Sequence, residues 1–187
     1  QEGKILQIDL QTPLQWNGAT LDGNPVDSVH RRAEYVYHVY LKNTIHKGER
    51  HVLRVQYGGK PRRAFNPPWD GGFTWDKDQN GSYFIATSCQ GLGASAWWPC
   101  KDHMYDEPDS MRISVTVPKP LMDVSSGRLE KTLDLGDKTT YQWVVKNPIN
   151  NYGVNLSIAQ YVPFGETYQG EKGPLELRFY ALKEDEE

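Results

Sequence analysis

Hydrophobic and polar residues alternate with a period of two along most of the chain, as expected of half-buried β-strands. Leu6, Ile8 and Leu10 alternate with polar neighbours, and the run 35–41 is aromatic and β-branched throughout. Such side chains pack well on a pleated sheet, so both segments are predicted to be strands. Further strands are predicted over residues 51–57, 83–87, 112–117, 124–129, 139–146, 154–161 and 175–181.

Turn-forming residues punctuate these strands at short intervals. The turn signals are Asp22-Gly23-Asn24, Gly58-Gly59, Asn80-Gly81, Gly136-Asp137 and Asn147-Pro148. Short strands with frequent turns are typical of antiparallel all-β folds. No ten-residue segment has a helical period, and only the acidic tail 184–187 is predicted to open a helix. The predicted fold is therefore all-β, an antiparallel saddle or sandwich of short strands with long loops and little or no helix.

The longest stretch without a strand pattern runs from residue 58 to residue 80. It holds three prolines and the aromatic residues Phe65, Trp69, Phe73 and Trp75. A loop of this length in a compact domain is usually functional or covers an apolar surface.

Composition narrows the class of protein. A chain of 187 residues is long enough for one domain with its own core, and 37% hydrophobic with 24% charged residues is typical of a globular protein. The net charge of -3, with lysines and arginines scattered, gives no reason to expect a nucleic acid partner. No apolar run approaches the ~20 residues of a membrane span.

Metal sites are weakly indicated. The five histidines form no H-E-x-x-H pattern, so we interpret them as scattered surface or partly buried residues. The run 76–81 (Asp-Lys-Asp-Gln-Asn-Gly) matches the first half of a calcium loop, but Thr87 stands where a bidentate Glu is needed. A hairpin turn ending in Asn-Gly explains the same residues without an ion.

The candidate catalytic groups form no complete active site. Cys89 and Cys100 have His103 close in sequence, but structural thiols are the favoured interpretation, either free and buried or joined in one bridge. The acidic residues of 102–109 are read as a turn before a strand rather than as paired catalytic carboxylates. Tryptophans 69, 75, 97 and 98 are candidate sugar platforms, whereas Trp143, beside Val144 in a strand, is predicted to lie in the core.

The most informative segment is 88–108. It contains Ser-Cys-Gln, a Gly/Ala-rich turn, Trp-Pro-Cys-Lys-Asp and then Asp-Glu-Pro, before a strand that ends in Val-Pro at residue 118. This order resembles the N-terminal domain of the zinc aminopeptidases of the aminopeptidase N and leukotriene hydrolase family. Residues 147–161 resemble its late strand pair, and 68–75 (Pro-Trp-Asp-Gly-Gly-Phe-Thr-Trp) resemble a segment of a bacterial branch. The resemblance covers most of residues 5–181.

The resemblance implies a saddle-shaped β domain beside a thermolysin-like catalytic domain. It also implies that Gln90 projects into the active site and holds the free α-amine of a peptide substrate. Ser88, Cys89 and Gly91 would line that loop. The chemistry is suitable, because an ammonium group only donates hydrogen bonds and the Gln side-chain carbonyl accepts them. Gly91 would let the backbone pass close to the bound residue.

Other parts of the family pattern are missing from the sequence. The H-E-x-x-H zinc motif and the G-x-M-E-N segment, which in the family lie in the next domain, are absent, and so are the expected first strands. The spacing between Asp102 and Asp106 is longer than in the P-C-F-D-E-P form. We therefore expect residues 1–187 to be one accessory domain, shortened at its start, that has no catalytic activity alone and holds no cofactor. Zinc, the peptidase activity and an intramolecular contact are expected to come from the missing catalytic domain.

Two other functions fit an all-β chain. One is a carbohydrate-binding module that uses the tryptophans named above, and the other is a structural or adhesin-type sandwich. The compartment is left open, with a periplasmic or secreted location slightly favoured over a cytoplasmic one.

Overall fold

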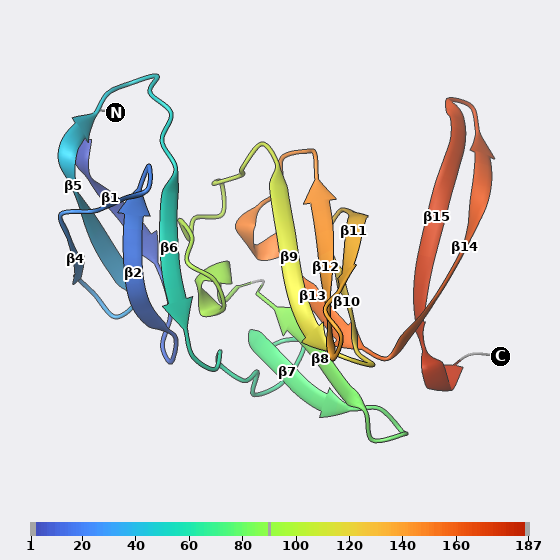
Figure 1. The fold of residues 1–187 in the computed structure, drawn as a ribbon. Coiled ribbons are helices and arrows are strands. Elements are labelled where there is room, and N and C mark those ends of the chain that lie inside the picture. The colour runs from blue at the N-terminus through green and yellow to red at the C-terminus, as the bar shows by residue number, and fades with distance from the viewer. Residues whose placement is uncertain (1–2, 90, 186–187) are drawn as a thin grey trace. The chain divides into compact units, whose positions relative to one another are not determined.

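The computed structural model describes residues 3–89 and 91–185. The strands are β1 Gly3–Asp9, β2 Gln15–Leu21, β3 Asn24–Pro25, β4 Ser28–Arg31, β5 Val36–Ile45, β6 Leu53–Gly58, β7 Gly72–Lys77, β8 Tyr83–Ser88, β9 Met111–Pro118, β10 Met122–Ser125, β11 Arg128–Asp134, β12 Lys138–Val145, β13 Leu156–Ala159, β14 Tyr161–Gly170 and β15 Gly173–Leu182. The helical segments of the described chain are three short 3₁₀ turns, η1 Ala94–Ala96, η2 Asn151–Gly153 and η3 Lys183–Asp185. The predicted all-β class is confirmed (Figure 1). Within the described ranges, no helix is long and apolar enough to cross a membrane.

The chain divides into two compact units, each built from several stretches of sequence. Unit 1 comprises residues 1–73, 88–108 and 150–154, and unit 2 comprises residues 74–87, 109–149 and 155–187. That residues 1–187 form one domain stays a prediction.

Unit 1 contains two three-stranded antiparallel sheets. In the first, β5 lies between β1 and β4, and in the second, β2 lies between β3 and β6. The β5 pairing brings Val39 opposite both Leu6 and Val29. Leu10 and Val39 are almost fully buried, so the strand predicted from aromatic and β-branched residues forms the centre of this unit.

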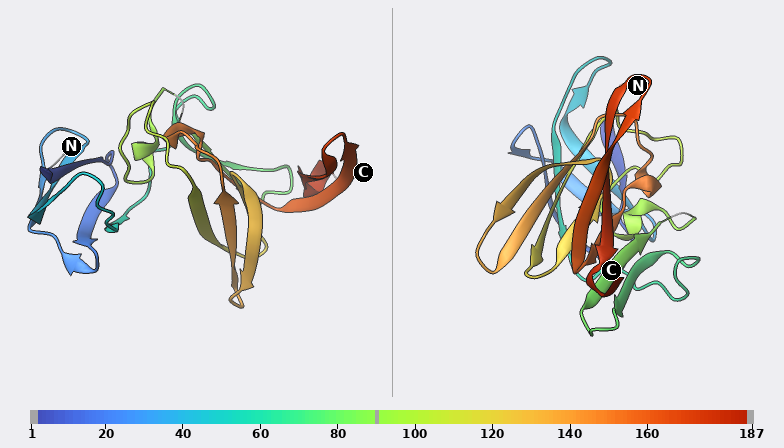
Figure 2. Two further views of the ribbon diagram at one scale, coloured as in Figure 1. Left: turned by 90° about the horizontal axis from the view of Figure 1, so that it is seen from above. Right: turned by 90° about the vertical axis from the view of Figure 1, so that its right-hand side faces the viewer.

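Unit 2 contains a four-stranded sheet in the order β10-β13-β8-β7, a three-stranded sheet with β12 at its centre, and the hairpin β14–β15. Trp143 on β12 is 3% exposed, which confirms its predicted place in the core. Its indole ring meets Tyr180 of the hairpin edge to face, with ring centroids 6.1 Å apart. Figure 2 shows β14 and β15 lying against each other, and each pairs with no other strand of the described chain.

Most predicted strands appear within two residues of their predicted ends. Two predictions were wrong, one about a continuous strand over 124–129 and one about a strandless loop over 58–80. The predicted strand 124–129 is split into β10 and β11 at Gly127, which has φ of +94° and whose Cβ, if present, would lie 2.4 Å from the Val144 carbonyl oxygen. The long loop 58–80 contains β7, which the sequence pattern did not indicate.

The C-terminal region also differs in detail from the expectation. The predicted strand 154–161 is represented by β13, and a further long strand, β14, starts at Tyr161. The acidic tail forms η3 over Lys183–Asp185, and residues 186 and 187 lie outside the described chain.

Candidate functional site

The segment that follows β8 folds back toward β1 within unit 1. The amide of Gly93 donates to the carbonyl of Cys89 at 2.8 Å, and η1 follows directly. Asp9 and Cys100 then exchange two backbone hydrogen bonds, of 2.7 and 3.2 Å. These contacts join the segment to the end of β1 and fix both of its ends.

Buried polar side chains hold the middle of this segment. The Gln11 carboxamide donates to the carbonyl of Leu92 at 2.9 Å and to Oγ of Ser95 at 3.0 Å. Oδ2 of Asp102 accepts from the amide of Ser95 at 3.2 Å and from its hydroxyl at 2.5 Å. Charge-assisted bonds of this kind are stronger than neutral ones, so Asp102 fixes the turn from inside. Within the acidic run 102–109, Asp102 therefore has a structural role, which is to hold the turn at Ser95.

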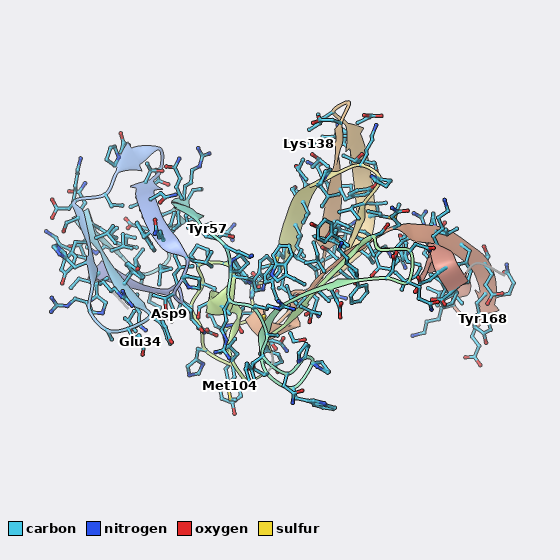
Figure 3. All side chains as sticks on the ribbon, turned by 90° about the horizontal axis from the view of Figure 1, so that it is seen from below. Asp9, Glu34, Tyr57, Met104, Lys138 and Tyr168 are labelled. Carbon is cyan, nitrogen blue, oxygen red and sulfur yellow. The ribbon has the colours of Figure 1, made fainter. Side chains whose placement is uncertain are left out.

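Beside this segment lies a hollow of about 700 Å³, lined only by residues of unit 1. Its lining includes Cys89, Gly91, Leu92 and Gly93 from the segment. The rest of the lining is Gln7, Asp9, Gln11, Tyr35, Val36, Ser95, Asp102, His103, Met104, Asn151 and Tyr152. Two of these lining residues, Asp9 and Met104, are labelled in Figure 3 and locate the hollow.

A second hollow of about 490 Å³ shares Gln7, Asp9, Asp102 and His103 with the first and adds Lys101, Tyr105 and Asp106. Both hollows are therefore lined by carboxylates. Lys101 pairs with Asp106 at 2.9 Å, and Oδ2 of Asp9 accepts from the amide of Asp102 at 3.1 Å. Carboxylates outnumber lysines and arginines in both linings, even with Lys101 counted in the second, so each lining favours a cation over an anion.

The two cysteines are free and buried, in line with the structural interpretation. Burial raises the pKa of the Cys89 thiol to about 11, and burial together with nearby Asp102 and Asp9 raises the pKa of Cys100 as well. A thiol held protonated is a poor nucleophile, so neither residue is suited to covalent catalysis.

Gln90, the predicted amine anchor, lies outside the described residues. Its neighbours are described: Ser88 ends β8, Cys89 is buried and Gly91 is exposed with φ of +82°. The role of Ser88, Cys89, Gln90 and Gly91 stays a prediction. The two residues that flank Gln90 in sequence, Cys89 and Gly91, both line the 700 Å³ hollow.

The same geometry bears on the metal interpretations. Residues 76 and 77 end β7, and residues 78–82 form the turn to β8, in which Asp78 accepts from the amides of Ser82 and Gly81 at 2.8 and 3.0 Å. The hairpin interpretation of the half calcium loop is therefore confirmed. Across residues 3–89 and 91–185, no group of three or more His, Cys, Asp and Glu side chains could hold a metal ion.

The candidate sugar platforms differ in exposure. Trp97 and Trp98 are half-buried and meet edge to face, and Phe73 packs on Trp97 in the same way. Trp75 is also half-buried, whereas Trp69 is 85% exposed. Only Trp69 of these four presents most of its ring to solvent.

The aromatic loop, residues 62–72, contacts the segment after β8. A Cβ on Gly71 would lie 2.4 Å from the Leu92 Cβ and 2.9 Å from the Ser88 carbonyl oxygen. The sequence marked 58–80 as a long loop, but it carries no signal that this loop touches the residues on either side of Gln90. The loop runs into β7 and the segment follows β8, and these two strands are neighbours in one sheet.

Comparison with known proteins relates this geometry to solved structures. No family model matches the sequence, and no curated protein matches it either. Among solved structures, an M1 zinc metallopeptidase from Deinococcus radiodurans matches 97% of this chain at 18% identity, with a TM-score of 0.81. The chain has the fold of part of an M1 zinc metallopeptidase.

Two further structures carry the same M1 fold. A mutant of the Deinococcus radiodurans enzyme bound to a Tyr-Ser-Ala substrate matches 96% of this chain at 20% identity and a TM-score of 0.80. Legionella pneumophila aminopeptidase A, in complex with aspartic acid, matches 98% at 13% identity and a TM-score of 0.73. The chain spans 40% of the length of the Deinococcus proteins and 20% of the Legionella protein. The M1 fold explains why the sequence resemblance extends over most of residues 5–181.

Proposed function

We propose that this chain is the N-terminal, substrate-anchoring part of a zinc-dependent aminopeptidase that removes amino-terminal residues from peptides. The observation that carries the proposal is the M1 fold, which accounts for 96–98% of the chain but for 40% or less of the matched enzymes. The described residues do not fit a zinc site, so zinc would be held by residues outside these 187. The chain alone would bind part of the substrate and catalyse nothing.

In this proposal Gln90 accepts hydrogen bonds from the α-ammonium group of the peptide. A neutral amide binds a cation less strongly than a carboxylate does, but it adds no charge to a site already rich in carboxylates. Asp9, Asp102 and Asp106 line the adjoining hollows and would favour the approach of a cationic chain end. Rigid support comes from the hydrogen bonds that fix Gly93, Ser95 and Cys100.

The test is kinetic and uses the complete polypeptide that contains this chain. Gln90→Ala should lower kcat/KM for aminoacyl amides by about 5- to 150-fold, equivalent to about 1–3 kcal/mol for a lost charge-assisted contact. Gln90→Glu should keep most of the activity, because a carboxylate also accepts from an ammonium group. The control is Gln169→Ala, an exposed glutamine on β14. Unchanged kinetics in Gln90→Ala would remove Gln90 from the site.

A carbohydrate-binding function is the second candidate, and the exposure of Trp69 favours it. Saturable quenching of tryptophan fluorescence by a glycan, abolished by Trp69→Ala, would support this function over the first. Indole rings that stack on sugars are normally exposed in this way, but they are equally suited to apolar peptide side chains.

A further inference from the structure

The aromatic loop presents the two most exposed large hydrophobic side chains of the described chain. Phe65 is 93% exposed and Trp69 is 85% exposed. Each such side chain carries roughly 150–250 Å² of surface, most of which is in contact with solvent. The loop therefore offers a solvated aromatic surface that its own unit does not cover.

This exposure is held in place by hydrogen bonds. The Asp70 carboxylate accepts from the Arg62 guanidinium at 2.5 Å and from the amide of Phe65. The carbonyl of Asn66 accepts from the amides of Trp69 and Asp70, each at 3.0 Å. The two rings therefore stand on a loop whose backbone is fixed between them.

The ends of the loop are fixed as well. The amide of Ala64 donates to the carbonyl of Phe73, and the amide of Phe73 donates to the carbonyl of Arg62, both at 2.8 Å. Gly72, at φ of +125°, leaves no room for a side chain, because a Cβ there would lie 2.7 Å from the Arg62 carbonyl oxygen. Ordering a loop this firmly costs conformational entropy, which a merely connecting segment has no need to lose.

The loop lies against the segment that contains Gln90 in its sequence. Gly71 would bring a Cβ into contact with both Ser88 and Leu92, the residues two positions before and after Gln90. Trp69 is two residues from Gly71. With at most 3.8 Å between successive Cα atoms, the backbone of Trp69 lies within about 13 Å of that of Leu92. An extended peptide advances about 3.3 Å per residue, so its first few residues can span such a distance.

We propose that Phe65 and Trp69 form a specificity surface for apolar side chains near the amino terminus of the peptide substrate. This inference rests on the proposed function, because Gln90 must hold the α-amine for the peptide to pass the loop. The chemistry follows from the two rings, which gain from covering aromatic and large aliphatic side chains and gain little from alanine or a hydrated lysine.

The experiment measures selectivity in the complete polypeptide. The substrates are tripeptides that carry Phe, Leu, Lys or Ala in turn at positions one, two and three, with Ala elsewhere. For Trp69→Ala and Phe65→Ala, the ratio of kcat/KM for Phe over Ala should fall at least fivefold at one position. Hydrolysis of Ala-Ala-Ala should change less than twofold. Trp69→Phe should restore most of the ratio, and Tyr168→Ala, an exposed aromatic on β14, is the matched control.

The outcomes separate the inference from the proposed function. Unchanged ratios in both variants would overturn the inference and leave the function standing. A fall of equal size for every peptide, Ala-Ala-Ala included, would also overturn it, because that result reports structural damage. Glycan binding lost in Trp69→Ala, with peptide ratios unchanged, would assign the loop to sugars instead. If Gln90→Ala had no effect on any peptide, Gln90 would be removed from the site, and with it the amine-anchoring role on which this inference rests.

Discussion

At the scale of single residues, the candidate site depends on how closely Asp102 approaches the backbone of η1. The Asp102 carboxylate binds both the amide and the hydroxyl of Ser95. Gly93 stands so near that a Cβ would lie 2.1 Å from Oδ2 of Asp102, and its φ of +94° is strained for any other residue. Two separate reasons, a steric one and a conformational one, therefore require glycine at position 93.

Gly93→Ala should consequently destabilise the chain far more than Gly91→Ala. Gly91 has a similar φ of +82°, but apart from its chain neighbours no described residue comes within 4 Å of the place that a Cβ would take. It therefore bears only the conformational cost of roughly 1 kcal/mol. Gly93→Ala adds the clash with Asp102 and should cost at least twice as much. Urea unfolding followed by circular dichroism measures both values. Equal losses in the two variants would contradict the close approach of Asp102.

At the scale of elements, the hairpin β14–β15 stands apart, because its two long strands pair only with each other among the described strands. Directly paired residues share a face, and Phe164 opposite Phe179 and Tyr168 opposite Leu175 place exposed apolar side chains on one face. The opposite face holds Tyr180, which meets Trp143. A two-stranded hairpin is marginally stable in water without further packing.

We therefore expect the amide hydrogens of the hairpin tip, around Gly170 and Gly173, to exchange with solvent at least tenfold faster than those of β12. Strand β12 pairs on both sides, with β11 and with β9, whereas β14 and β15 pair only with each other among the described strands. Hydrogen exchange measured by NMR or mass spectrometry on residues 1–187 tests this order. Protection of the tip equal to that of β12 would show that the hairpin is stabilised by packing beyond its own strand pairing.

The same scale shows what the sequence could predict. Period-two alternation located β6, β9 and β12 within a few residues, because each strand buries one regular set of side chains. The aromatic and β-branched run 35–41 located β5. The split at Gly127 was missed, since the turn is imposed by the approach of Val144 from another strand. Contacts between distant segments leave no local pattern, and for this reason the meeting of the aromatic loop with Ser88 and Leu92 was also invisible in the sequence.

The candidate site shows the same division. The unusual composition of 88–108 identified the segment, and Cys89 and Cys100 are free and buried, which is one of the two states that the sequence left open. The partnership of Gln11 with Leu92 could not be predicted, because these residues are 81 positions apart in sequence. The bond from Ser95 to Asp102 spans only seven positions, but it depends on the irregular turn between them, for which the sequence has no periodic pattern. The amine-anchoring role of Gln90 remains a prediction from resemblance.

At the scale of the whole molecule, one buried acid should make folding stability depend on pH. Asp123 on β10 is 0% exposed, and its carboxylate accepts from the Trp143 indole and the Ser125 hydroxyl, both at 3.0 Å. Its other oxygen has no hydrogen-bond partner among the described residues. Burial raises the pKa of Asp123 from 3.8 to about 6, against the smaller opposing effect of these two donors. The folded state therefore prefers the protonated acid more than the unfolded state does.

The sign of the effect follows from that shift. The stabilisation that Asp123 provides by binding a proton is complete below the unfolded pKa of 3.8 and is lost as the pH rises through about 6. A shift of about two units corresponds to about 3 kcal/mol. Somewhat less than half of that amount should disappear from the free energy of unfolding between pH 5 and pH 7.5, and the rest is lost at lower pH. Asp123→Asn, which cannot ionise, should abolish this part of the pH dependence. The measurement is urea unfolding of both proteins at several pH values.

The control for this prediction is Asp137→Asn, which removes an exposed carboxyl from the turn before β12 and should keep the wild-type slope. The slope of unfolding free energy against pH is more informative than the absolute stability. Asp123→Asn would place an NH₂ group where one carboxylate oxygen has no partner in the described chain, and an unpaired buried donor lowers stability at every pH. All three proteins carry the same five histidines, so any contribution of histidine cancels in the comparison. A slope unchanged by Asp123→Asn would mean that water reaches this carboxylate and that the core of unit 2 is more open than its packing indicates.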